Sequence, residues 1–222
     1  MEQIKTLNLD KEGTAIPLPE VKKVLDFMTY ASSVRVMFGM LFWTGCRICE
    51  LDNMKRGNIY GDYVYWKTGK NQNDYRKEKL PKYYIDELKE YWATNRLLGD
   101  RMFSVTHDTF RRYFNKFVRP FLNDQWREER LVYKQSKLTR ENILQLKGLR
   151  KTFQTFVFAQ ELWKWKDSKV ALEFTSKKMR HSSERMTCYH YLNNFDVLGI
   201  DNPQDVKPFA EVRQKRLLDF FS

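Results

Sequence analysis

Residues 34–51, VRVMFGMLFWTGCRICEL, join the most apolar segment of the chain to a pair of opposite charges. The first ten residues are apolar nearly all round a helical projection, which predicts a helix at the buried centre of the domain. Thr44 and Gly45 break this helix, and a short helix restarts at Arg47. A charge against a core is costly unless it has a partner, and Glu50 lies three residues on, on the same helix face. The pair is either a structural ion pair or a guanidinium that Glu50 orients for a phosphate.

Hydrophobic periodicity predicts mostly helix on both sides of this stretch. Residues 58–80 instead alternate apolar and polar, with turn signals at Gly61-Asp62 and Gly69–Asp74, which predicts a small antiparallel sheet with a long, basic hairpin loop. We expect one domain without internal repeats. Helices are expected at 20–29, 34–43, 83–97, 109–122, 149–162, after a cap at Asp167 or Ser168, after a cap at Ser182 or Ser183, and at 203–222, with 123–145 mostly irregular.

The charge balance of the 222-residue chain indicates a polyanionic partner. Forty basic residues against 28 acidic ones give a formal net charge of +12. Such an excess favours nucleic acid or an anionic membrane surface, and a lysine-rich solvated face is the plainer alternative. No apolar run approaches the roughly 20 residues that cross a bilayer, and the polar N-terminus does not resemble a signal peptide. We therefore expect an intracellular, cytoplasmic protein.

Three cysteines make an odd count, which argues against a disulfide scaffold and favours a reducing compartment. Cys46 and Cys49 form a C-x-x-C pair, but no second Cys or His pair lies nearby. We interpret them as two small apolar residues on a helix rather than as a zinc or redox site. Because the sequence has no cluster of acidic or histidine ligands, we expect neither metal nor cofactor.

Two further clusters interrupt apolar helices. In KGLRKTF (147–153), Lys147 and Arg150 share a helix face because they are three residues apart. Taken alone, that pattern is typical of a solvated basic helix end. In MRHSSERMTCYHYLN (179–193), His181 is followed within one helix by a second histidine and two tyrosines. The three clusters together are far more specific than any one of them.

In order and spacing, these stretches resemble the sequence boxes of the tyrosine recombinases, or integrases. TGCRICEL (44–51) is similar to the family's T-G-x-R-x-x-E-L box, KGLRKTF to its H-x-x-R-H-T-F box, and MRHSS with MTCYHYLN to its final G-H-S-S…T-T…Y box. The resemblance covers about residues 18–195 and leaves 1–17 as a lead-in and 196–222 as a helical tail. It implies an α+β fold, mainly α, in which a tyrosine-recombinase-like catalytic domain carries a small antiparallel sheet.

The resemblance also implies the residues of the site. MTCYHYLN is similar to family variants that read T-T-x-x-H-Y-x-H, so Tyr191 is the expected nucleophile, with Tyr189 as the alternative. The family has a lysine in the hairpin after its first box. Lys70, in KTGKNQNDYRKEKLP, lies in a stretch that is similar to its G-K-x-x-x-x-R-x-x-P hairpin, with Lys67 and Lys77 as rivals. The expected site residues are Arg47, Lys70, Lys147, Arg150, His181 and Tyr191.

Two positions depart from the family pattern. Lys147 stands where the family usually has histidine, and lysine is a poor base at neutral pH although it still donates to phosphate oxygens. We therefore expect Lys147 to stabilise charge rather than to move a proton. Arg180 stands where many members have glycine, which adds a positive charge. The family often carries a separate N-terminal DNA-clamping domain, and with about 17 residues before the first helix we expect that domain to be absent from this sequence. Either the sequence is a fragment, or it is a minimal recombinase that depends on a partner or binds DNA weakly.

The implied activity is site-specific DNA recombination, as in a mobile element or virus. A tyrosine cuts and rejoins DNA through a 3′-phosphotyrosyl intermediate, without metal or ATP. The implied partners are double-stranded DNA and further copies of the chain in a tetramer on that DNA, with no membrane. The apolar stripe of the tail would dock on a neighbouring protomer or fold back in cis. The alternatives are a type IB topoisomerase and a non-catalytic DNA-binding protein on the same fold.

Overall fold

Helix α2 (Ser33–Thr44) runs through the centre of the structure, and its residues from Val36 to Thr44 are all buried. The Ser32 hydroxyl caps it by accepting from the backbone N–H of Arg35. It ends where Gly45 takes a left-handed conformation, φ 59°, and donates its N–H to a carbonyl of the last turn. The buried helix and its break at Thr44-Gly45 are confirmed.

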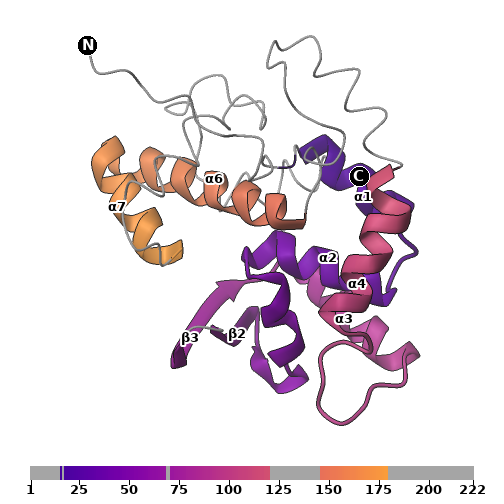
Figure 1. Ribbon diagram of the computed structural model, residues 1–222. Coiled ribbons are helices and arrows are strands. Elements are labelled where there is room, and N and C mark those ends of the chain that lie inside the picture. Colours follow the sequence, from indigo (N-terminus) through magenta and orange to yellow (C-terminus); the bar gives the residue numbers. More distant parts are fainter. Residues whose placement is uncertain (1–15, 17, 69–70, 121–145, 180–222) are drawn as a thin grey trace.

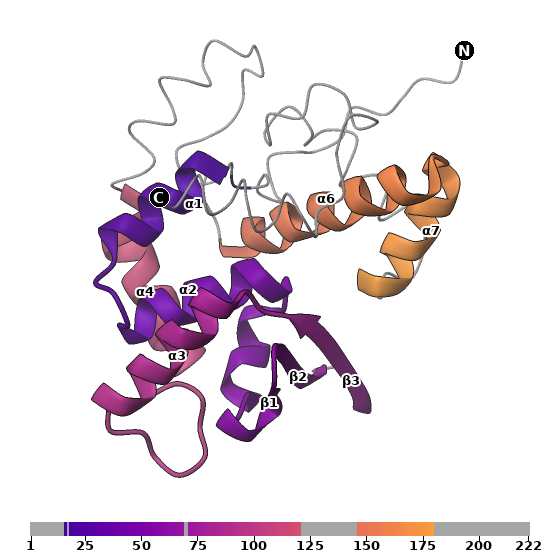
Figure 2. The same ribbon diagram turned by 180° about the vertical axis from the view of Figure 1, so that it is seen from behind.

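The computed structural model describes residues 16, 18–68, 71–120 and 146–179 (Figure 1). Four helices contact α2, and a fifth, α7, packs against α6 at the far end of the structure. The small sheet lies beside the C-terminal end of α2, as the view from behind also shows (Figure 2). The helices in contact with α2 are α1 (Leu18–Phe27), α3 (Lys82–Thr94), α4 (His107–Tyr113) and α6 (Leu146–Trp165), and α7 spans Ser168–Met179.

The observed helices match the expected ones with small differences at their ends. Helix α6 extends three residues beyond the expected 149–162 at each end. Asp167 caps α7, because its carboxylate accepts from the N–H groups of Lys169 and Val170. The helix expected at 109–122 begins two residues earlier, at His107, as α4. It then widens into a π-helical turn, η4 (Phe114–Val118). In that turn the Arg119 N–H donates to Phe114 O, five residues back.

The predicted antiparallel sheet is confirmed. Its strands are β1 (Ile59–Tyr60), β2 (Tyr63–Thr68) and β3 (Asn71–Lys79), in the order β1-β2-β3. The pairing shifts between Lys67 and Thr68, so that Thr68 faces Asn71. Residues 71–74, expected in the hairpin loop, thus belong to β3, because the irregular pairing lets the strand continue toward the turn.

The restart after Gly45 is a 3-10 helix, η2 (Ile48–Asn53), with Arg47 as its N-cap residue, and a further turn, η3 (Arg56–Asn58), follows. The interpretation of the C-x-x-C pair as two small apolar residues on a helix is correct only in part for each cysteine. Cys46 is buried before the helix begins, whereas Cys49 is exposed. The reason is the threefold repeat of a 3-10 turn, which turns Ile48 and Leu51 to the core and leaves Cys49 outside.

Several expectations fall on residues outside the described part of the chain. They are the irregular segment 123–145, the helix after Ser182 or Ser183, and the tail helix at 203–222. The division into lead-in, catalytic domain and tail stays a prediction. Within the described ranges, no helix combines the length and apolar character that a membrane crossing needs.

Gly45 offers a sharp test of how α2 meets α6. A Cβ at this position would lie 2.3 Å from the Phe153 ring, in addition to the positive φ. We expect Gly45→Ala to lower the free energy of unfolding by about 3 kcal/mol, through left-handed strain plus overpacking, measured by urea denaturation. Gly61→Ala is the matched control, because Gly61 has φ +58° but open space around it, and it should cost only about 1 kcal/mol. Equal losses in the free energy of unfolding of the two variants would contradict the close approach of Gly45 to the Phe153 ring.

Candidate functional site

The candidate site contains a fully buried carboxylate, that of Glu50. Its side chain has no exposed area. It accepts from the Arg47 backbone N–H (2.9 Å), from Arg47 Nη1 (3.1 Å) and from Trp66 Nε1 (3.0 Å). Burial by itself raises the pKa of Glu50, but these hydrogen bonds outweigh it and hold the pKa below the ordinary 4.5. Glu50 is therefore an ionised carboxylate that holds Arg47 in place, while the Arg47 side chain keeps 39% of its area exposed.

Arg150, on α6, reaches the same place from a different box of the sequence. Its Nη1 donates to Gly45 O, and its Nη2 donates to Met179 O at 3.0 Å. The guanidinium thus ties the end of α2 to the end of α7. Burial, followed by repulsion from Arg76 and Arg47, lowers the pKa of Arg150 to about 10. An anion bound beside Arg150 would relieve that repulsion.

Arg76, on β3, is a member of the site that the sequence analysis missed. It is only 6% exposed and stacks over the Trp66 ring at 5.0 Å. Its Nη2 lies 3.8 Å from Glu78 Oε1 and 4.0 Å from Met179 Sδ. The carboxylate is therefore beyond good hydrogen-bond distance. Burial is the main cause that lowers the pKa of Arg76, and Glu78 partly opposes it.

A signal for Arg76 was present in the strand alternation. Val64 and Trp66 point inward on β2, and Arg76 pairs with Trp66 across the hairpin, so it occupies an inward position. The arginine of the hairpin pattern was visible in the sequence, but the pattern carried no role for it. A buried position filled by arginine is the feature that marks it.

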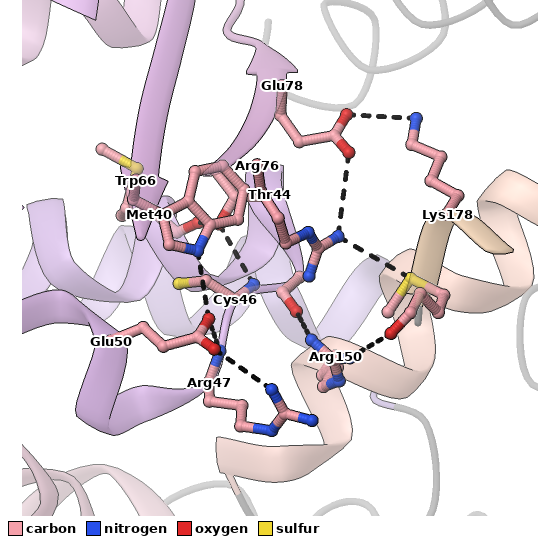
Figure 3. A network of polar contacts seen from close by, with 12 residues as sticks. Met40, Thr44, Cys46, Arg47, Glu50, Trp66, Arg76, Glu78, Arg150 and Lys178 are labelled. Atoms are coloured by element: carbon pink, nitrogen blue, oxygen red, sulfur yellow. Dashed lines mark hydrogen bonds and ion pairs between the residues drawn. The ribbon is translucent and has the colours of Figure 1, made fainter. Parts of the chain in front are cut away.

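The cluster as a whole carries more positive than negative charge. Lys178 Nζ lies 3.1 Å from Glu78 Oε2 and completes the set (Figure 3). Four cationic side chains thus stand around two carboxylates, contributed by α6, α7, β3 and the turn after α2. The cations are Arg47, Arg76, Arg150 and Lys178, and the carboxylates are Glu50 and Glu78.

The structure brings together two of the six predicted site residues, Arg47 and Arg150. Lys147 lies one turn before Arg150 on α6, and its side chain is exposed. Lys70, His181 and Tyr191, with the alternative Tyr189, lie outside the described residues, so these assignments stay predictions.

Lys67 and Lys77, the two alternatives to Lys70, lie on the face of the sheet opposite to the one that carries Arg76. Lys67 and Lys77 alternate with the inward Trp66 and Arg76, and both are exposed. Their ammonium groups sit over tyrosine rings, with Lys67 Nζ 5.4 Å from the centre of the Tyr75 ring. Neither shares the face of the arginine cluster, and the assignment of Lys70 stays a prediction.

Cys46 lies in the same region as a buried thiol. Burial is the main cause that raises its pKa to about 12, so the thiol is protonated at neutral pH and is a poor nucleophile or metal ligand. Among the residues that the structure describes, no group of three or more His, Cys, Asp or Glu side chains is placed to hold a metal ion.

Comparisons with known proteins match the fold but not the sequence. No protein-family model and no curated protein matches the chain. XerA recombinase matches with a TM-score of 0.51 and 19% identity, over 91% of this chain and 65% of that one. The Tn1549 transposon integrase matches with a TM-score of 0.51 and 13% identity, over 83% of this chain and 63% of that one. A lambda integrase dimer bound to a COC' core site matches with a TM-score of 0.48 and 15% identity, over 80% of this chain and 47% of that one.

The matches to XerA recombinase and the Tn1549 integrase define the class of fold. The chain has the fold of a tyrosine recombinase catalytic domain, as the resemblance of its sequence boxes implied. It spans between about half and two thirds of the length of the matched proteins.

The role of Glu50 can be tested by its pH dependence. Because its pKa in the folded chain lies below 4.5, its stabilising effect is complete above that value and is lost as the pH falls through the folded pKa. We expect Glu50→Gln to lower the free energy of unfolding by about 2 kcal/mol at neutral pH. The difference in the free energy of unfolding between Glu50→Gln and the parent chain should become smaller below pH 4.5, as measured by chemical denaturation at a series of pH values.

Asp86→Asn is the control, because Asp86 is exposed and forms a surface ion pair with Lys89 at 3.8 Å. Such pairs contribute roughly 0–1 kcal/mol. A Glu50→Gln difference that stays constant well below pH 4.5 would contradict the ionised carboxylate.

Proposed function

We propose that the chain is a tyrosine-type site-specific recombinase that cuts and rejoins double-stranded DNA. The observation that carries the proposal is the meeting of Arg47 and Arg150, a hundred residues apart in sequence, in one cluster of excess positive charge. Guanidinium groups suit this role because their planar fork binds two phosphate oxygens at once. The fold supports the same class, and the matched Tn1549 integrase was solved in complex with a circular intermediate DNA.

The proposed chemistry follows from the charge of a phosphodiester. Its negative charge repels nucleophiles, and the pentavalent transition state carries more charge. Arg47 and Arg150 would hold the non-bridging oxygens, and Lys147 and His181 would add donors there. Preorganised donors of this kind contribute about 3–4 kcal/mol each in comparable sites. We add Arg76 to this set as a buried positive charge near Arg150.

The proposed nucleophile is Tyr191, acting by covalent catalysis. Its phenolic oxygen releases its proton to solvent and attacks phosphorus, the bond to the 5′-oxygen breaks, and a 3′-phosphotyrosyl bond forms. Lys70 gives the leaving 5′-oxygen its proton as general acid. The 5′-hydroxyl of another strand then attacks the same phosphorus and releases Tyr191. The energy of the phosphodiester is kept in the protein–DNA bond, so the cycle consumes no ATP.

We further propose that copies of the chain assemble as a tetramer on intracellular DNA, such as that of a mobile element or virus. DNA binding would draw on the net charge of +12. Phosphate contacts of this kind weaken steeply as salt rises.

The central test is a covalent adduct with a nicked suicide DNA substrate, resolved on a denaturing gel. We expect an adduct at one sequence, its loss in Tyr191→Phe, and its retention in Tyr189→Phe. An adduct that survives in Tyr191→Phe would move the nucleophile to Tyr189. No adduct with any DNA would favour a non-catalytic DNA-binding protein, and relaxation of supercoiled plasmid without site preference would favour a type IB topoisomerase.

The contribution of Arg76 is tested by Arg76→Met, which keeps an unbranched apolar stem and removes the charge. We expect single-turnover cleavage to slow by about tenfold, or about 1.4 kcal/mol, while the free energy of unfolding changes less because Glu78 keeps its ion pair with Lys178. Arg112→Met, at an exposed position of α4, is the matched control. An unchanged cleavage rate in Arg76→Met would reduce Arg76 to a structural residue.

A further inference from the structure

The face of the sheet turned away from the arginine cluster is built from two residue types. Strand alternation sends Trp66 and Arg76 inward and their neighbours outward. Every outward position whose side chain the structure describes on β1, β2 and β3 is a tyrosine or a lysine. We call this set the tyrosine-lysine face, and it consists of Tyr60, Tyr63, Tyr65, Lys67, Tyr75, Lys77 and Lys79.

The register of the sheet pairs each lysine with a tyrosine. Across β2 and β3 the pairs are Tyr63 with Lys79, Tyr65 with Lys77, and Lys67 with Tyr75. Lys77 Nζ lies 4.0 Å from the centre of the Tyr63 ring and 5.4 Å from that of Tyr65. On the described part of the hairpin, the face therefore presents aromatic rings with ammonium groups over or next to them.

Sheet stability alone does not account for this composition. Cross-strand pairs contribute about 0.2–1 kcal/mol each, and many residue types would serve. Tyr60 pairs only with Tyr63 across β1 and β2 and is 80% exposed, so packing gives no reason for an aromatic ring there. The carboxylate nearest the face in the described contacts is Asp62, in the turn at its edge, 3.8 Å from Lys79. The face is thus basic and aromatic.

We propose that the tyrosine-lysine face binds a single-stranded segment of nucleic acid. Unpaired bases stack on exposed aromatic rings, and lysines neutralise the phosphates between them, which is how sheet surfaces hold single strands. A duplex fits less well, because its bases already stack on one another and would use only the lysines. This binding is independent of the recombinase reaction, since the face lies on the other side of the sheet from Arg76 and Arg150.

The test measures binding of fluorescein-labelled oligothymidylate to the full chain by fluorescence anisotropy. The double variant Tyr60→Ser, Tyr75→Ser should raise Kd by about tenfold or more, since each stacked base contributes about 1–3 kcal/mol. Tyr60→Phe with Tyr75→Phe keeps both rings and should change Kd less than about twofold. Lys67→Gln with Lys77→Gln should weaken binding and flatten its dependence on salt between about 50 and 200 mM.

Tyr30→Ser is the matched control, because Tyr30 is also exposed, at 52%, but lies in the turn before α2. Equal losses in Tyr30→Ser, no loss in the serine double variant, or equal affinity for a duplex of the same length would overturn the proposal. An oligouridylate arm tells whether RNA is held as well as DNA.

The same variants separate this proposal from the recombinase activity. The serine double variant should still form the covalent adduct, and Arg150→Ala should still bind oligothymidylate. Thermal melting of each variant verifies that the fold is kept. Oligothymidylate binding that disappears in Arg150→Ala and persists in the serine double variant would place the single strand at the arginine cluster and overturn the role of the face.

Discussion

The buried Glu50 carboxylate is the interaction on which the arrangement of the site depends. It joins the turn after α2 to β2, because it accepts from both Arg47 and the Trp66 indole. Trp66 in turn lies under the Arg76 guanidinium. One ionised group thus sets the position of an arginine and of the ring that supports another. Removing it would leave Arg47 without its internal acceptor and the Trp66 N–H unsatisfied, which is the costly side of a buried hydrogen bond.

Three guanidinium groups in one region are an unfavourable arrangement for the isolated chain. Repulsion from Arg76 and Arg47 adds to burial in lowering the pKa of Arg150. The chain offsets part of this cost with Glu50, Glu78 and the two carbonyl oxygens that hold Arg150. The remaining positive potential is a form of preorganisation, since the groups already stand where an incoming negative charge would be stabilised.

The sequence predicted the parts of the fold that rest on local patterns. The run of apolar residues predicted α2, Gly45 predicted its end, and alternation over 58–80 predicted the sheet. It did not predict the 3-10 geometry of η2 or the π turn of η4, because both depend on how side chains from distant segments fill the core. In the site, Arg47 and Arg150 were found through their boxes. Arg76 was missed because its importance arises from cross-strand pairing with Trp66, which brings it beside Arg150.

The π-helical turn at Phe114–Val118 has a consequence for comparing this chain with distant relatives. Such a turn holds one residue more than an α-helical turn of the same height. Phe110, Phe114 and Val118 are all buried, so the wider turn keeps a core-facing row with a spacing of four residues. If a relative has an uninterrupted α-helix at this place, an alignment without a gap puts the residues after the turn one position out of step. Alignments across this fold should therefore permit a single-residue gap there, and the buried row is the marker by which to place it.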